Sequence, residues 1–153
     1  MSADTSQILV RPATTEDIFV LVDMIRTMAR ESEDRELDPS TLQNGVKAVF
    51  EQQPTLGTYW LGILPATQEI IANLLITTEW SDWNNTFYWW IQSMYIKPEH
   101  RGKGLITQML RSIEAEGRKV GVAELRLYAH KLNDRAIKAY KKAGFFDNRY
   151  MMM

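Results

Sequence analysis

The segment that most constrains the fold is an apolar strand pattern that runs into a basic glycine turn and then into a helix pattern. Residues Phe87 to Ile96 are apolar or aromatic at both alternating sets of positions, apart from Gln92 and Ser93, which is typical of a central strand covered on both faces. A Gly-Lys-Gly turn follows at residues 102–104, and apolar residues recur at helical spacing from Leu105. The first amides of such a helix have no internal partner and lie at its positive end. The segment therefore predicts a binding site for a phosphate-bearing ligand.

Composition limits the kinds of protein that this chain can be. With 153 residues, of which 45% are hydrophobic, we expect one domain over residues 1–153 with a sizeable core. The formal net charge of −1 gives no general attraction for nucleic acid, so no nucleic-acid partner is expected. The lack of cysteine excludes disulfides, thiolate metal sites and a cysteinyl acyl-enzyme, and two histidines are too few for a histidine-based metal site. No metal is therefore expected.

Two further observations concern the cell compartment. No apolar run reaches the length that spans a membrane, and residues 1–7 are polar, unlike a signal peptide. We therefore expect no membrane partner. A chain without disulfides suits the cytoplasm, which is the predicted location.

Hydrophobic periodicity divides the chain into strand and helix patterns. Strands are predicted at Ile8–Pro12, Gly57–Leu64, Glu69–Thr78, Phe87–Ile96 and Ala123–Ala129, with room for a last strand within Phe145–Met153. Helix starts are marked by Thr14 with Asp17, by Pro39-Ser40 with Gln43, by the glycine turn, and by Asn133. Gly144 suits the left-handed position that ends the last helix. The order β-α-α-β-β-β-α-β-α-β predicts a mixed α/β sheet covered by helices.

Three interpretations of the glycine turn compete on the local sequence. A nucleotide-triphosphate P-loop needs G-x-x-x-x-G-K-[ST], but Lys103 is followed by Gly104. A dinucleotide fingerprint needs G-x-G-x-x-G, but position 107 is Thr and the turn comes late in the chain. A surface turn that uses glycine only for its tight geometry needs no ligand.

The wider context resembles the GCN5-related N-acetyltransferases (GNAT). The segment Tyr95–Leu105, with Arg101-Gly102-Lys103-Gly104 at its centre, resembles the pyrophosphate-binding motif of that family. Asn133–Phe145 resembles its second signature, an Asn-capped helix with an inward tyrosine before Gly-Phe, and Val10–Ile18 resembles its opening segment. The three segments fall in the family's order and cover essentially the whole chain. The resemblance implies the acyl-CoA N-acyltransferase fold, a mixed central sheet with a splay between strands four and five and helices on both faces.

The resemblance also implies where acetyl-CoA, the co-substrate of such enzymes, would lie. Its pantetheine arm would enter the splay and pair with the main chain of Met94, Tyr95 and Ile96. Its pyrophosphate would sit on the amides of the turn and the helix start, namely Arg101, Gly102, Lys103, Gly104, Leu105, Ile106 and Thr107. Ile106 departs from the family pattern, which has a small residue there, so we expect weaker or shifted binding rather than loss.

Two residues of the last helix receive roles from the resemblance. Tyr140 would be the catalytic residue and would protonate the leaving CoA thiolate, since a phenol with a pKa near 10 stays protonated at pH 7. The alternative for Tyr140 is a core tyrosine with a satisfied hydroxyl. Asn133 caps the helix, and in the family its amide also meets the cofactor.

The expected reaction is direct attack of a primary amine of a small molecule on the thioester within a ternary complex. Some family members carry a glutamate on the strand before the turn, but the matching position here is Gln92, which cannot take a proton. Glu79 would lie about 17 Å away along the strand if the hairpin closes as expected. A water relay, a carboxylate of residues 31–36, or an acceptor with a low amine pKa remains open. His130 is a further candidate base, and its alternative is a surface residue at the strand end.

The acceptor side is the least readable part of the sequence. Glu31, Glu33, Asp34 and Glu36 could attract a cationic amine, or they could form a solvated helix end. Trp80 and Trp83 could line a pocket or a dimer contact, so a homodimer is one expected arrangement. Gln92 motivates an alternative function, an acyl-CoA-binding sensor or interaction domain with little catalysis.

Overall fold

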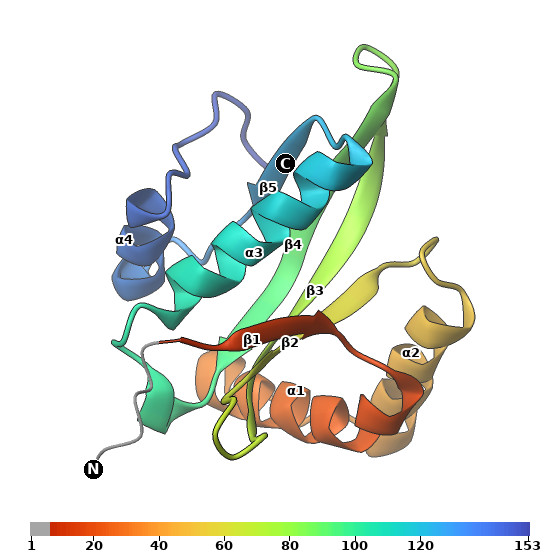
Figure 1. Ribbon diagram of the computed structural model, residues 1–153, viewed down its shortest axis with the longest axis vertical. Helices are drawn as coiled ribbons and strands as arrows, with labels where there is room; N and C mark the ends of the chain where they lie inside the picture. Colours follow the sequence, from red (N-terminus) through yellow and green to blue (C-terminus); the bar gives the residue numbers. More distant parts are fainter. Residues whose placement is uncertain (1–6) are drawn as a thin grey trace.

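The computed structural model describes residues 7–153, which form one sheet in the order β1-β2-β3-β4-β5 flanked by α-helices (Figure 1). The strands are β1 (Leu9–Pro12), β2 (Thr58–Ile63), β3 (Ile70–Ser81), β4 (Thr86–Ile96) and β5 (Glu124–Leu127). The helices are α1 (Ile18–Glu33), α2 (Pro39–Glu51), α3 (Leu105–Val120) and α4 (Asp134–Lys142), with short 3₁₀ turns η1 (Thr15–Asp17) and η2 (Pro98–His100). Within this part of the chain, no helix has the length and apolar character needed to cross a membrane.

The sheet is mixed, as the sequence predicted. Strands β1 to β4 pair antiparallel in chain order, whereas β4 and β5 pair parallel. A parallel pair needs a crossover connection, and α3 provides it. The long β3–β4 hairpin closes with Ser81 opposite Thr86 and extends beyond the helices (Figure 1). Strand β4 therefore lies between β3 and β5 within the sheet.

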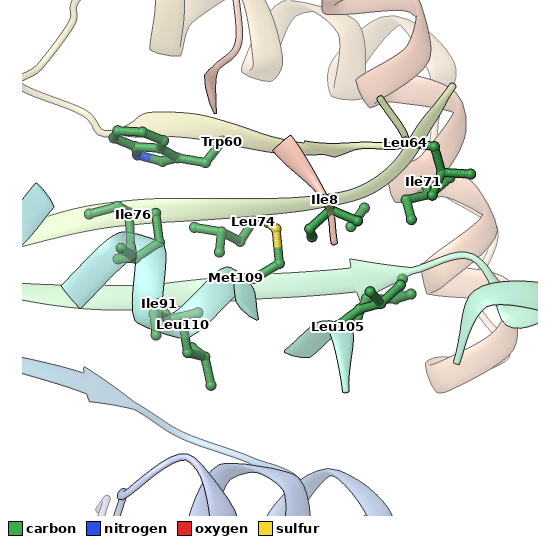
Figure 2. Close-up of a cluster of buried hydrophobic side chains, with 13 residues drawn as sticks. Ile8, Trp60, Leu64, Ile71, Leu74, Ile76, Ile91, Leu105, Met109 and Leu110 are labelled. Atoms are coloured by element: carbon green, nitrogen blue, oxygen red, sulfur yellow. The ribbon is translucent and has the colours of Figure 1, made fainter. Parts of the chain in front are cut away.

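Two apolar clusters fill the two faces of the sheet. On one face α3 buries Leu105, Met109 and Leu110 against strand residues that include Leu74 and Ile91 (Figure 2). On the other face α1 and α2 pack against β2 through a cluster of Leu21, Val46, Val49, Tyr59, Leu61 and Ile63. Helix α4 adds partly buried side chains to the α3 cluster. Helices thus cover both faces, which confirms the predicted layers.

Capping side chains mark the starts of η1 and of α2. Asp17 Oδ2 accepts the Thr14 N–H at 2.8 Å, so the predicted pairing of these residues forms just before α1. At α2 the cap is Asp38, one residue earlier than the predicted start, and its Oδ2 accepts the Thr41 N–H at 2.9 Å. Pro39 then occupies the first helical turn, where its missing N–H costs nothing.

The predicted last strand within Phe145–Met153 is wrong. Residues 145–153 contain no strand, and Phe146 and Tyr150 are 89% and 68% exposed. Their apolar side chains do not alternate, because a polar run at 147–149 separates them, so no continuous face could be buried. The strand predicted at Ala123–Ala129 forms only over Glu124–Leu127, since its pairing with β4 ends there.

Candidate active site

Strand β4 is paired on both sides over its first half and on one side over its second half. Its parallel ladder with β5 ends at Ile91 opposite Leu127. Beyond this point β4 continues to Ile96 with β3 as its only paired neighbour among residues 7–153. The two strands separate here, and this is the predicted splay.

A β-bulge marks the point at which β4 and β5 separate. Leu75 of β3 lies opposite Ser93, whereas the next residue, Ile76, lies opposite Ile91. Gln92 is therefore the extra residue of the bulge. A bulge bends a strand and re-aims its main chain, so the sequence position that the resemblance singled out coincides with a change in backbone direction.

The hydrogen-bond register of β4 fixes which main-chain groups face the splay. The Lys97 N–H donates to the Ile71 carbonyl at 2.9 Å, so Lys97 and, two residues earlier, Tyr95 direct their main-chain groups toward β3. Met94 and Ile96 alternate with them and direct their N–H and C=O groups toward the open side. Of the three predicted pantetheine residues, these two have the main-chain orientation that such pairing needs, and of their carbonyls that of Ile96 already accepts from Arg101 Nε at 2.8 Å.

The glycine turn has the backbone geometry that requires glycine. Gly102 has φ +77° and Gly104 has φ +74°, both in the left-handed region. Gly104 is the residue that precedes α3, and a Cβ built on it would meet no atom within 4 Å. The free amides at the start of α3 therefore face a space that no side chain of Gly104 fills, which suits an anion.

The side chains of the turn and first helical residues point in different directions. Lys103 is exposed, whereas Leu105 is buried in the α3 cluster. Ile106 is partly buried and packs against the same cluster. Its β-branched side chain thus faces the core. The effect of Ile106 on cofactor binding stays a prediction. Thr107 is half-buried in the same helical turn.

Arg101 is held on the α1 side of the turn. Its Nε donates to the Ile96 carbonyl at 2.8 Å, and its Nη2 donates to Glu31 Oε2 of α1 at 2.8 Å. Its guanidinium lies 5.3 Å from the centre of the Tyr95 ring. The positive charge that the sequence pattern assigned to the phosphate is thus paired with a carboxylate.

Tyr140 lies on α4 and packs against the α3 cluster, with its ring 6.3 Å from that of Phe145. Burial raises the pKa of Tyr140 above its usual value, so its hydroxyl stays protonated at neutral pH. No described residue forms a hydrogen bond with this hydroxyl. Both interpretations of Tyr140, a core tyrosine and a proton donor, stay predictions.

Asn133 performs its predicted capping role. Its Oδ1 accepts the Ala136 N–H at 3.2 Å at the start of α4. The helix ends at Lys142, and Gly144 follows with φ +103°. The direct contact between Asn133 and the cofactor stays a prediction.

The chain matches the family model described as "Acetyltransferase (GNAT) family" over residues 21–145. This span contains the bulge, the glycine turn and Tyr140. The chain belongs to the GNAT family. Enzymes of this family use acetyl-CoA as their co-substrate, and this protein is accordingly an acetyltransferase.

Individual relatives agree with this assignment. The thialysine N-epsilon-acetyltransferase of Sus scrofa is 25% identical over 148 residues, which cover 93% of this chain and 86% of that protein. A crystal structure of a possible acetyltransferase from Clostridium difficile 630 matches with a TM-score of 0.86 and 31% identity over 95% of each chain. An aminoglycoside acetyltransferase from an uncultured soil metagenomic sample, in complex with sisomicin, shares the fold with a TM-score of 0.76 and 13% identity, over 95% of this chain and 93% of that one.

Gln92 stands where some GNAT enzymes carry a glutamate, and two hydroxyl groups hold its amide. Its Oε1 accepts from Thr77 Oγ1 at 3.4 Å, and its Nε2 donates to the Tyr128 hydroxyl at 3.0 Å. The Tyr128 ring lies 6.2 Å from that of Trp90. The bulge therefore carries a polar and aromatic surface without a carboxylate on Gln92 itself.

The other candidate bases have local roles. Glu79 lies opposite Tyr88 and accepts from Arg126 Nη1 at 3.2 Å, far along β3 from the bulge. His130 is exposed, and its Nδ1 accepts the Leu132 N–H at 3.2 Å in the loop before α4. Neither contact directs a base toward the splay.

Half of the acidic stretch at the end of α1 is already paired within this GNAT chain. Glu31 binds Arg101, and Glu36 binds Arg30. The pKa of the Glu36 carboxyl is lowered by its hydrogen bond to Arg30. Asp34 ends α1 in a left-handed conformation. A cationic acceptor would therefore meet less free negative charge here than the sequence suggested.

Trp80 and Trp83 lie at the exposed end of the β3–β4 hairpin, where they are 54% and 89% exposed. Trp80 also packs against Phe87 with ring centres 5.0 Å apart. They line neither the splay nor the turn. A homodimer through this end of the molecule stays a prediction, as does the cytoplasmic location.

One group of side chains outside the splay has the spacing of metal ligands. Ligand atoms of Glu69, Glu99 and His100 lie within 4.8 Å of one another. The Lys97 ammonium already lies 3.2 Å from Glu69 Oε1, so a cation of the protein itself occupies part of this position.

Sequence reasoning missed two side chains that the fold brings to the site. Tyr128, which follows the last residue of β5, contacts Gln92 of β4. Arg135 lies beside Gly102, which is distant in the sequence. A positively charged residue in the first turn of the Asn133-capped helix was the available signal for Arg135.

Proposed function

We propose that this protein is an acetyl-CoA-dependent N-acetyltransferase that acetylates the primary amine of a small molecule by direct attack in a ternary complex. The observation that carries the proposal is the open second half of β4, which leads from the bulge into the glycine turn. Main-chain groups of Met94 and Ile96 face the open side there, and the amides of α3 follow directly. An extended amide-bearing arm that ends in a pyrophosphate has the chemistry that this arrangement fits.

The residues of the chain supply two functions in the transfer. The amine nitrogen attacks the thioester carbonyl carbon, the carbon–sulfur bond breaks, and the thiolate leaves. The Met94 N–H stabilises the oxyanion that forms on the carbonyl oxygen, and the Tyr140 hydroxyl gives its proton to the sulfur. The raised pKa of Tyr140 keeps that proton in place until a thiolate forms nearby.

The amine must lose a proton before it attacks. An alkyl amine with a pKa near 10.4 is neutral in only about one in 10³ molecules at pH 7, a cost of about 4–5 kcal/mol. Gln92 cannot accept this proton, but it holds the Tyr128 hydroxyl at 3.0 Å. We propose that a water at this hydroxyl carries the proton to solvent, which also favours acceptors with a low amine pKa.

The small-molecule acceptor is supported by what the relatives are named for. The Sus scrofa protein is named for thialysine, and the soil enzyme was crystallised with sisomicin. Glu33 and Asp34, the two exposed carboxylates of this stretch that form no ion pair among the described residues, give a weak preference for a cationic acceptor.

A thiol-release assay tests the proposal. The protein is mixed with acetyl-CoA and a panel of small amines, and free CoA thiol is followed with time. We expect release with at least one amine, and a loss of about 100-fold or more in kcat for Tyr140→Phe, the usual contribution of a general acid. Tyr59→Phe is the matched control, because Tyr59 is also buried, with its pKa raised by burial, but lies on the opposite face.

The alternative function, an acyl-CoA sensor, predicts a different result. Tight binding of CoA without turnover of any amine would support the sensor and would contradict catalysis. Failure of the protein to bind CoA would exclude both functions.

A further inference from the structure

Two arginines flank the glycine turn, and the structure gives them different surroundings. Arg101 belongs to the turn itself, whereas Arg135 belongs to the first turn of α4. The predicted pyrophosphate site includes Arg101, whereas Arg135 is not among the predicted residues. The contacts of the two guanidinium groups lead to the opposite assignment.

The guanidinium of Arg101 is used by the protein itself. It binds the Ile96 carbonyl and Glu31 Oε2, each at 2.8 Å, and it lies over the Tyr95 ring. Glu31 Oε1 also accepts from the Tyr95 hydroxyl at 3.2 Å. Arg101, Glu31 and Tyr95 thus form a closed group that joins the end of β4 to the end of α1. A guanidinium neutralised in this way contributes little attraction to a second anion.

The guanidinium of Arg135 lies on the turn. Its Nη2 is 3.5 Å from the position that a Cβ on Gly102 would take. Because Gly102 has no side chain, the space next to this guanidinium is not filled by one. Helix α4 is capped by Asn133 and packs beside α3 through Tyr140. Within residues 7–153, Arg135 has no carboxylate partner at ion-pair distance. Its charge is therefore available to an anion at the turn.

We propose that Arg135 supplies the guanidinium that binds the CoA pyrophosphate, and that Arg101 is a positioning residue that holds the turn against β4 and α1. A planar guanidinium can donate two parallel hydrogen bonds to phosphate oxygens, while the α3 amides bind the same group from the other side. The proposal rests on the proposed function, because it names residues for the donor of that reaction.

Calorimetric binding of three ligands separates the two roles. CoA carries the pyrophosphate and a 3′-phosphate, dephospho-CoA carries the pyrophosphate alone, and pantetheine carries neither. For Arg135→Ala we expect about tenfold weaker binding of CoA and of dephospho-CoA, unchanged binding of pantetheine, and a smaller loss at high salt. For Arg101→Ala we expect a similar loss with all three ligands and a lower melting temperature. Glu31→Gln reproduces this pattern in a milder form.

Two further variants serve as controls. Lys138→Ala removes an exposed cation one turn further along α4 and should leave all three affinities unchanged. Arg135→Lys keeps the positive charge but lacks the paired donors of a guanidinium. It should retain more CoA affinity than Arg135→Ala. Glu31→Gln also covers the case in which Arg101→Ala fails to fold.

Three binding results would contradict the proposal. Wild-type affinity of Arg135→Ala for CoA overturns the proposal, and so does a loss confined to CoA, which would assign Arg135 to the 3′-phosphate. A selective loss of CoA over pantetheine in Arg101→Ala also overturns it. If the wild-type protein does not bind CoA, the proposed function itself is contradicted. If the wild-type protein binds CoA and neither arginine variant changes the affinity, only the proposal about the arginines is contradicted.

Discussion

The two faces of the sheet hold their parts of the site by different means. On the face of α3 and α4, the proposed donor site is built largely of main-chain groups, namely the open half of β4 and the amides that follow Gly104. On the face of α1 and α2, side-chain ion pairs fix both ends of α1. Arg11 binds Asp17 at the first end, and Arg101 binds Glu31 at the last.

This difference has a mechanistic consequence. Main-chain groups present the same chemistry whatever the neighbouring side chains are, so the donor side can bind the invariant parts of one co-substrate. Side chains set the shape and charge of the acceptor side, so that side can vary between enzymes of one fold. Substitutions on the two faces should therefore fail in different assays, binding on one face and stability on the other.

The largest expected effect concerns the donor face. Gly104→Ala places a methyl group in the open space at the start of α3, and we expect about 100-fold weaker CoA binding as charge-assisted hydrogen bonds are lost. Gly121→Ala is the matched control, because Gly121 has φ +76°, borders the other end of α3, and also has no atom within 4 Å of a built Cβ. Both variants should lose about 1–2 kcal/mol of stability from the left-handed backbone. Equal CoA affinity in the two variants would contradict the anion site.

The next effect concerns the other face. Asp17 is 7% exposed and receives hydrogen bonds from Arg11 and from the Thr14 N–H. Asp17→Ala should lower the free energy of unfolding by about 2 kcal/mol, since it removes a buried carboxylate that accepts charge-assisted hydrogen bonds from Arg11. Glu16→Ala, at the exposed neighbouring carboxylate, should change it by less than about 0.5 kcal/mol. Urea unfolding followed by circular dichroism measures both, and similar losses would refute the role of the ion pair.

The same carboxyl predicts a pH dependence. The hydrogen bond from Arg11 holds the pKa of Asp17 below its usual value, although burial opposes the shift. The unfolded chain therefore takes up the proton first, at about pH 3.9. The stabilisation is complete at neutral pH and is lost as the pH falls from about 5 through the folded pKa. Asp17→Asn should flatten this part of the curve of stability against pH, and an unchanged acid slope in that variant would contradict the assignment.

The fold was largely predictable because its signals are local. Period-two patterns located the strands, and the capping residues Thr14 and Asn133 located two helix starts. The prediction of a last strand at residues 145–153 is wrong because apolar composition does not indicate whether a partner strand is present. The predicted end of β5 is wrong for the same reason. Pairing with β4, and not the residue pattern, decides where that strand ends.

The site divides along the same line. The glycine turn and the capped helix could be recognised because their chemistry lies in consecutive residues. The contact between Arg101 and Glu31 spans 70 residues, and that between Gln92 and Tyr128 spans 36. Such pairs depend on how helices and strands meet in space, which no local pattern encodes. The sequence could therefore indicate the donor and its turn, but it could not tell which arginine is free to meet a phosphate.

The smallest expected effect concerns the bulge of β4, in the sheet that separates the two helix layers. Gln92→Glu places a carboxylate between the hydroxyls of Thr77 and Tyr128, and both can donate to it as they now contact the amide. Because a positioned base assists removal of the amine proton, we expect kcat to rise by about tenfold at pH 7, with little change in KM for acetyl-CoA.

Gln68→Glu, in the exposed turn before β3, adds the same charge away from the bulge and should leave kcat unchanged. If Gln92→Glu lowers kcat, the carboxylate disturbs the bulge more than it helps the proton transfer, and Gln92 then acts by orienting Tyr128. If both variants raise kcat alike, the effect is one of overall charge, and the bulge is not where the amine loses its proton. The separation of the two results would place the proton transfer at the one residue of β4 that neither neighbouring strand pairs.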